Sequence, residues 1–109
     1  MAGRLEGKVA IVTGAGSAGP GLGNGKATAL RFAQEGARVF AVDRSTEAVA
    51  ETARLIEAEG AACIAHTADV AEEAEVAAFV ERCVGTWGQV DVLHNNVGIL
   101  APGGPEDVT

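Results

Sequence analysis

Short apolar runs alternate along this chain with longer segments that have helical periodicity. The runs at 8–13 and 38–42 are rich in β-branched residues and short enough to be strands buried on both faces. Segments 25–35 and 46–59 space their apolar residues three and four positions apart, as on one face of a helix. This alternation is typical of parallel strands joined by crossover helices.

The second half of the chain repeats the alternation. Residues 61–66 and 90–94 are predicted strands, and 99–109 are rich in proline and glycine, as in a loop. The apolar face of the helix at 46–59 is Ala48, Val49, Thr52, Leu55 and Ile56. The helix between the last two strands has the apolar face Val76, Phe79, Val80, Cys83, Val84 and Trp87.

The ends of the helices also have sequence signals. Ser45 or Thr46 is expected to cap the second helix, because a side-chain oxygen there can accept a free backbone N–H. Glycines after an apolar stripe favour the left-handed turn that ends a helix. The glycines expected to end or break the helices are Gly36, Gly60, Gly85 and Gly88.

A glycine-rich segment joins the first strand to the first helix, and an acid ends the second strand. Glycines at 14–25 would let a pyrophosphate reach the helix N-terminus, where unpaired N–H groups carry about half a positive charge. Asp43 follows Gly25 at close to the offset of roughly 20 residues expected of an acid that binds ribose hydroxyls. This order predicts a dinucleotide site; the alternative is a flexible turn with a surface aspartate.

The predicted fold class is therefore α/β, a Rossmann-type doubly wound parallel sheet. The strand order should be 3-2-1-4, with the first two helices on one face and the third on the other. Residues 1–109 would form a single NAD(P)-binding domain that is truncated after strand four and incomplete at its C-terminal side.

Composition narrows the classes of function. Hydrophobic residues make up 48% of the 109 residues, which excludes a disordered chain. The net charge of −7 argues against nucleic acid but not against a phosphate held by backbone N–H groups. No signal peptide or membrane-spanning apolar run is present, so we expect a cytoplasmic protein. Cys63 and Cys83 lack metal-ligand spacing and are expected to be reduced, buried thiols rather than a disulfide.

Several motifs, in order along the whole chain, resemble the short-chain dehydrogenase/reductase family. They are TGAG at 13–16, Gly23 and Gly25, VDR at 42–44, Asp69 with Val70, and NNVG at 95–98. The resemblance implies an oxidoreductase that passes a hydride between NAD(H) or NADP(H) and an alcohol or carbonyl.

The resemblance assigns a role to each matching position. Around the pyrophosphate it places Gly14, Ser17, Gly23, Gly25 and the backbone of Asn24. Asp43 would bind the adenosine ribose, and Asp69 and Val70 would flank the adenine. Asn95 would border the adenine-side ribose and brace strand four. The positions expected to line the cofactor path are Val97 and Gly98.

Some of these residues have a second interpretation. The Asp43 carboxylate favours NAD because it would repel a 2′-phosphate, whereas Arg44 could pair with that phosphate. Asp69 could instead cap the third helix, with Glu72 completing a capping box. Asn95 and Asn96 could simply satisfy backbone groups at a strand end. No catalytic role is expected for the two histidines, His66 and His94.

Two departures from the family pattern qualify the expected activity. The glycine loop is longer by residues 18–22, a length nearer to that of the divergent enoyl reductases. The chain also ends at Thr109, before the positions of the family's catalytic serine and Tyr-x-x-x-Lys pair, and contains no tyrosine. We expect the chain by itself to bind cofactor without turnover and to be marginally stable, with strand four exposed as an edge.

Alternative functions also remain open. A non-catalytic dinucleotide-binding module fits these residues, as does a Rossmann domain for a flavin or a methyl donor. Within the family, an NADP-dependent or enoyl-reductase-like member is the alternative. A small-molecule substrate would bind only the full-length protein, which is expected to be a homo-oligomer.

Overall fold

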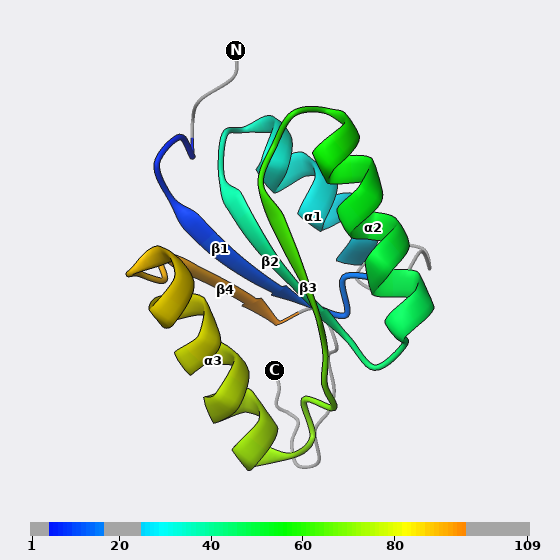
Figure 1. Cartoon of the computed structure of the whole chain (residues 1–109), viewed down its shortest axis with the longest axis vertical. Helices are drawn as coiled ribbons and strands as arrows, with labels where there is room; N and C mark the ends of the chain where they lie inside the picture. The colour runs from blue at the N-terminus through cyan, green and yellow to red at the C-terminus, as the bar shows by residue number, and fades with distance from the viewer. Residues whose placement is uncertain (1–4, 17–24, 96–109) are drawn as a thin grey trace, which may run out of the picture.

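The computed structural model describes residues 5–16 and 25–95, in which strands and helices alternate as predicted (Figure 1). The boundaries differ slightly from the predicted ones; strands three and four, for example, each begin two residues later. In chain order the elements are β1 (Val9–Thr13), α1 (Gly25–Gln34), β2 (Arg38–Asp43), α2 (Thr46–Ala58), β3 (Cys63–Thr67), α3 (Glu73–Trp87) and β4 (Val92–Asn95).

The strands form one parallel sheet in the order β3-β2-β1-β4, which confirms the predicted topology. In register, Thr13 at the end of β1 pairs with Val42 of β2 and with Asn95 of β4. Asp43 pairs with Thr67 at the end of β3. Because all strands run the same way, their carboxyl ends meet at one edge of the sheet, and the site is built there.

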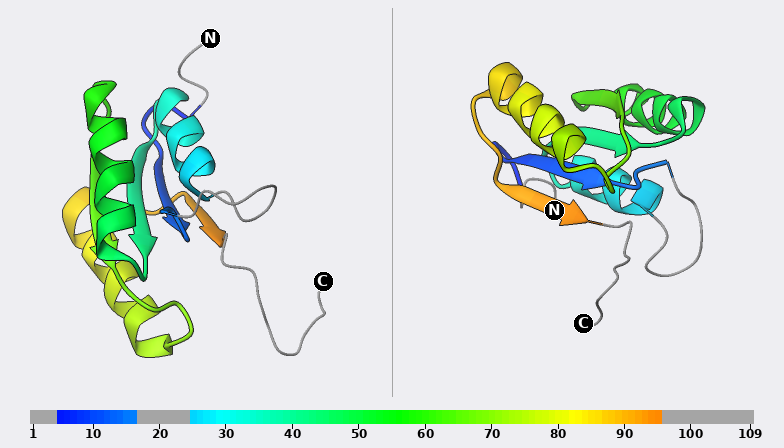
Figure 2. Two further views of the ribbon diagram at one scale, coloured as in Figure 1. Left: turned by 90° about the vertical axis from the view of Figure 1, so that its right-hand side faces the viewer. Right: turned by 90° about the horizontal axis from the view of Figure 1, so that it is seen from below.

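The two faces of the sheet are covered as predicted. Val12 and Val39 pack with Ala29 of α1 and Ile56 of α2 on one face. On the other face, Phe79 of α3 joins a second core cluster that includes Phe40 of β2. In the right-hand view of Figure 2, α1 and α3 accordingly lie on opposite sides of β1.

Two residues predicted for apolar helix faces are largely exposed. Leu55 is 40% exposed and Val84 is 43% exposed, so their placement in the core was wrong. The buried stripe of α2 is narrower than the predicted apolar face, and it includes Ala53 instead of Leu55. On α3, only Phe79 and Cys83 are fully buried. Each of these helices packs on the sheet along one narrow line of contact, so apolar residues at the sides of its stripe remain exposed to solvent.

The predicted end signals of the first two helices are confirmed, whereas one of the two glycines predicted to break the third helix does not do so. Ser45 caps α2, and its hydroxyl accepts the Ala48 backbone N–H at 3.2 Å. Gly36 has a φ of 100° after α1. Gly85 does not break α3, which continues to Trp87 and ends at Gly88, whose φ is 81°. A helix tolerates an internal glycine at a cost of about 1 kcal/mol, whereas the left-handed turn ends it.

The two cysteines are free thiols. Cys83 is buried, as expected, but Cys63 on the edge strand β3 is only partly buried. Burial, with a smaller contribution from Glu57, raises the pKa of the Cys63 thiol to about 12. Both thiols are therefore protonated and poorly nucleophilic near neutral pH. Within the described ranges, no helix combines the length and apolar character needed to cross a membrane.

At the opposite ends of the strands, Asp91 links the start of β1 to the turn before β4. The Val9 N–H donates to Asp91 Oδ2 at 2.8 Å, and the Asp91 N–H donates to the Val9 carbonyl at 2.8 Å. Gln89 donates its side-chain amide to the same carboxylate. The backbone hydrogen bond from Val9, followed by that from Gln89, lowers the pKa of Asp91. The charged form of Asp91 therefore favours the folded state.

Replacing Asp91 by Asn should flatten the acid dependence of stability. With a folded-state pKa below the unfolded value of about 3.9, the stabilisation by Asp91 is complete above that value and is lost as the pH falls through the folded-state pKa. Urea midpoints measured from pH 6 to pH 3 should fall less steeply for Asp91→Asn than for the wild type. Glu81→Gln, at an exposed carboxylate of α3, is the matched control; equal slopes for all three proteins would contradict this assignment.

Candidate functional site

The candidate site lies where the order of the strands reverses. β1 is flanked by β2 on one side and by β4 on the other, so the chain leaves β1 at the switch point of the sheet. Gly14, the first residue after β1, is buried and has a φ of 66°. Glycine adopts this left-handed conformation without strain. In open α/β sheets, ligands bind in the crevice beyond such carboxyl ends.

Backbone groups of the glycine loop are bonded to the end of β2. The Ala15 N–H donates to the Val42 carbonyl at 2.9 Å. The Gly16 N–H donates to Asp43 Oδ2, also at 2.9 Å. The start of the loop is thus held against the strand that carries the predicted ribose-binding acid, so the structure brings Gly14 and Asp43 together.

Asp43 accepts two hydrogen bonds from segments far apart in sequence. Its Oδ1 accepts the Ser45 N–H at 2.9 Å, while Oδ2 accepts the N–H of Gly16. The residue is only partly buried. A carboxylate has about four acceptor positions on its two oxygens, so each oxygen retains capacity for a further donor. The two N–H groups therefore orient the carboxylate without saturating it.

The α2 helix also contacts the loop. The Thr52 hydroxyl, fully buried, donates to the Ala15 carbonyl at 3.0 Å. A Cβ placed on Gly16 would lie 2.5 Å from the Cβ of Ala48. Sequence reasoning assigned Thr52 only to an apolar face and missed this contact. The available signal was a hydroxyl in an otherwise apolar stripe, which needs a buried acceptor.

The N-terminus of α1 suits an anionic group. The helix begins at Gly25, which is buried, and its first turn holds no acidic residue. Lys26 in that turn lies 3.8 Å from Glu51 of α2, measured from Nζ to Oε2. The dipole of the helix makes the local potential at this end positive.

The structure contradicts one of the two interpretations of Asp69, which lies in the segment after β3. Asp69 Oδ1 accepts the Ala71 N–H at 2.9 Å, and the Asp69 N–H donates to Glu75 Oε1 at 2.6 Å. The N-cap of α3 is Glu72, with no side-chain cap hydrogen bond. The alternative in which Asp69 caps this helix is wrong, because its carboxylate closes a turn within the loop and the helix begins later.

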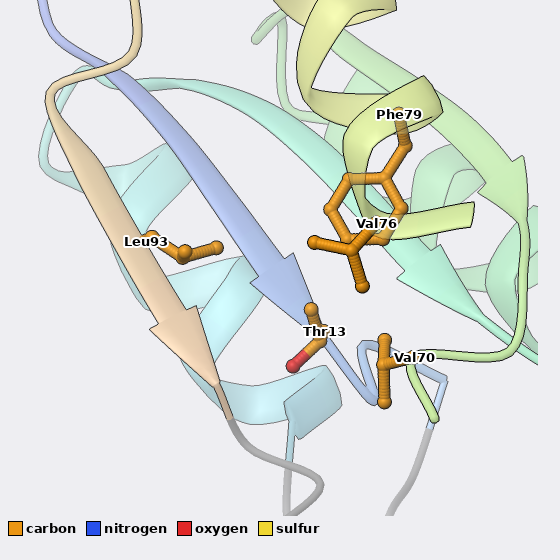
Figure 3. A pocket seen from close by; sticks show the side chains of 5 residues that line it. All are labelled: Thr13, Val70, Val76, Phe79 and Leu93. Carbon is orange, nitrogen blue, oxygen red and sulfur yellow. The ribbon is translucent and has the colours of Figure 1, made fainter. Parts of the chain in front are cut away.

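A small apolar pocket lies between the sheet and α3 at the same edge (Figure 3). Its cavity volume is about 70 Å³. Leu93 of β4, which lines it, is 55% exposed, in agreement with the expected exposed edge strand. The lining side chains, shown as sticks in Figure 3, are Thr13, Val70, Val76, Phe79 and Leu93. Because Val70 lines the pocket, the segment that follows β3 forms part of its wall.

The remaining predicted positions are distributed as follows. Arg44 is exposed directly after Asp43, and Asn95 ends β4 beside Thr13 in register. The positions that lie outside the described residues are Ser17, Gly23, Asn24, Val97 and Gly98.

The two histidines contact other side chains. Arg82 Nη1 donates to His66 Nδ1 at 2.8 Å, since a guanidinium has no acceptor. Burial and the adjacent Arg82 charge lower the pKa of His66, against a smaller opposing effect of Glu75. His94 meets Phe32 of α1 edge to face, with ring centroids 5.9 Å apart. Among the residues that the structure describes, no three His, Cys, Asp or Glu side chains are grouped as a metal site.

Comparison with known proteins agrees with this geometry. An uncharacterized oxidoreductase of Thermotoga maritima is 40% identical over 105 residues, which are 96% of this chain and 39% of that protein. This chain therefore spans well under half the length of that relative. A 3-ketoacyl-(acyl-carrier-protein) reductase of Brucella melitensis, solved with NADH, is 44% identical with a TM-score of 0.71, over 83% of this chain and 34% of that one.

A second solved structure and a family profile give the same result. A short chain dehydrogenase/reductase of Burkholderia phymatum, solved with NAD, is 34% identical with a TM-score of 0.74, over 83% of this chain and 30% of that one. The profile of the short chain dehydrogenases matches residues 8–109. The chain therefore belongs to the short chain dehydrogenase family.

Proposed function

We propose that residues 1–109 form the cofactor-binding part of an NAD-dependent oxidoreductase that acts on an alcohol or carbonyl substrate. When bound, the nicotinamide supplies the hydride chemistry, and these residues supply binding and orientation. The observation that carries the proposal is the Asp43 carboxylate, which is oriented by two backbone N–H groups at the switch point of the sheet. Family membership adds independent support.

The pyrophosphate would lie between the glycine loop and α1. The left-handed Gly14 leaves the end of β1 without a side chain, and the first turn of α1, at the positive end of the helix dipole, carries no acid. Both features fit a dianionic group. The proposal extends, on the family pattern, to Ser17, Gly23, Asn24 and Gly25.

The adenosine ribose would hydrogen-bond to Asp43. A carboxylate accepts hydrogen bonds from hydroxyl groups but repels a 2′-phosphate, by about 1 kcal/mol per charge pair at 4 Å in water and about 4 kcal/mol near a protein surface. This asymmetry supports NAD over NADP, although the exposed Arg44 is the residue that would pair with a phosphate. The two solved relatives described above were crystallised with NADH and with NAD.

The rest of the dinucleotide is assigned by the family pattern. Asp69 and Val70 would flank the adenine, and the partly buried Val70 lines a small apolar pocket at this edge of the sheet. Asn95 would border the ribose at the end of β4. Val97 and Gly98 would follow along the cofactor path.

The chain should bind NADH in solution. We expect saturable enhancement of NADH fluorescence, competed by NAD⁺ and ADP-ribose, because the proposed contacts are to the ribose and the phosphates. FAD and S-adenosylmethionine serve as controls for a flavin or methyl-donor domain. Competition by either of them, or no saturable NADH signal with the folded chain, would contradict the proposed function.

Replacing Asp43 by Asn should weaken NADH binding at least roughly tenfold, because a hydrogen bond to a charged group contributes about 1.5–3 kcal/mol. NADPH binding should change much less, since the repelling charge is also removed. Isothermal titration with both nucleotides tests this. Glu47→Gln, an exposed carboxylate in the first turn of α2, is the matched control. An equal loss for NADH and NADPH would contradict the role in cofactor choice.

Binding and turnover should separate in this chain. The family resemblance places the general acid at a tyrosine, and this sequence contains none. A tyrosine in that role protonates or deprotonates the substrate oxygen as hydride moves. Assays with primary and secondary alcohols should therefore show no alcohol-dependent NAD⁺ reduction. NAD⁺ reduction that exceeds the alcohol-free blank, and that stays with the protein through purification, would contradict this prediction.

A further inference from the structure

One peptide unit of the glycine loop is bonded at both of its ends. We propose that Thr52 is a positioning residue, which fixes the orientation of the Ala15–Gly16 peptide and through it the carboxylate of Asp43. The inference rests on the proposed function for its effect on dinucleotide affinity. The structural step, from Thr52 to the loop, does not depend on that function.

The two bonds come from different elements. The carbonyl of Ala15 accepts the Thr52 hydroxyl of α2 at 3.0 Å, and the N–H of Gly16 donates to Asp43 of β2 at 2.9 Å. These two groups belong to the same planar peptide, so they cannot rotate independently. A flip of this peptide would break both bonds at once. The orientation of the Asp43 carboxylate is therefore coupled to a hydroxyl on another element.

If the Thr52 hydroxyl is removed, a solvent water molecule cannot take its place as hydrogen-bond donor. Thr52 and Ala15 are both fully buried. The same hydroxyl lies 3.2 Å from the Ala48 carbonyl one turn back in α2, so its single proton is shared between the shorter bond to Ala15 and this local contact. Removing the hydroxyl would leave the buried Ala15 carbonyl with one donor fewer, which favours other loop conformations.

Close packing restricts the loop from the opposite direction. A Cβ on Gly16 would meet the Cβ of Ala48 at 2.5 Å and the Val49 nitrogen at 3.1 Å. The loop therefore cannot move further toward α2, and the Thr52 bond opposes movement away from it. Contact and hydrogen bond together define one position for the peptide.

Thr52→Val keeps the shape of the side chain and removes the hydroxyl. If a fraction of molecules then has the peptide reoriented, the apparent affinity for NADH falls in proportion to the competent fraction. We expect NADH binding to weaken roughly three- to tenfold, the range given by one buried hydrogen bond. Thr52→Ser should restore most of the affinity, because it retains the donor. Ile56→Val, one turn further along α2, removes buried volume but no hydrogen-bonding group, and it is the control for core packing.

A double-mutant cycle separates positioning from general destabilisation. In an Asp43→Asn background, Thr52→Val should cause little further loss, because the carboxylate that it positions is gone. The Gly16 amide should also exchange faster with deuterium in Thr52→Val than in Ile56→Val, with no nucleotide present. Additive losses in the cycle, or unchanged Gly16 exchange, would overturn the inference. Failure of the wild type to bind NADH would instead refute the proposed function, and the exchange measurement would still decide the structural step.

Discussion

The whole site depends on the two hydrogen bonds that Asp43 accepts. One fixes the start of the glycine loop at Gly16, and the other fixes the entry to α2 at Ser45. Without this acceptor, the backbone N–H groups of Gly16 and Ser45 would lose their partner. The Gly16 hydrogen bond is partly buried, where an unpaired N–H group is costly, whereas the Ser45 N–H is exposed to water. The same carboxylate therefore has a structural role in the free protein and a recognition role in the proposed complex.

Most of the fold could be predicted from the sequence because burial imposes different periods on strands and helices. The apolar runs at β1 and β2 are buried on both faces, so their pattern is continuous and unambiguous. The wrong predictions concern residues at the sides of the helical stripes and one glycine inside a helix. Leu55 and Val84 match helical spacing, but spacing alone does not tell where a stripe ends against a sheet. Gly85 shows that a glycine ends a helix only where the backbone turns left-handed.

The site was predicted in part, for a related reason. Gly14 and Asp43 stand at fixed places in a strand, loop and strand unit, so the sequence order itself brings them together. Thr52 and Asp69 have no such constraint. The acceptor of Thr52, the Ala15 carbonyl, lies far away in sequence and becomes close only when α2 packs on the sheet. The spacing of Asp69 and Glu72 matches a helix cap, yet the Asp69 carboxylate accepts the N–H of Ala71 within the loop. A cap and a local turn have the same sequence pattern, so the sequence does not distinguish them.

The two faces of the sheet differ in a way that explains why the loop is held by α2. The face toward α1 and α2 is built largely of alanine and valine, whereas the α3 face uses Phe40, Phe79 and Trp87. Small side chains let a helix approach the sheet closely, and this closeness puts Ala48 against Gly16 and the Thr52 hydroxyl within reach of the loop. Larger aromatic residues fill the α3 face, where a small pocket remains beneath the helix. The small side chains of the other face thus allow α2 to contact and position the glycine loop.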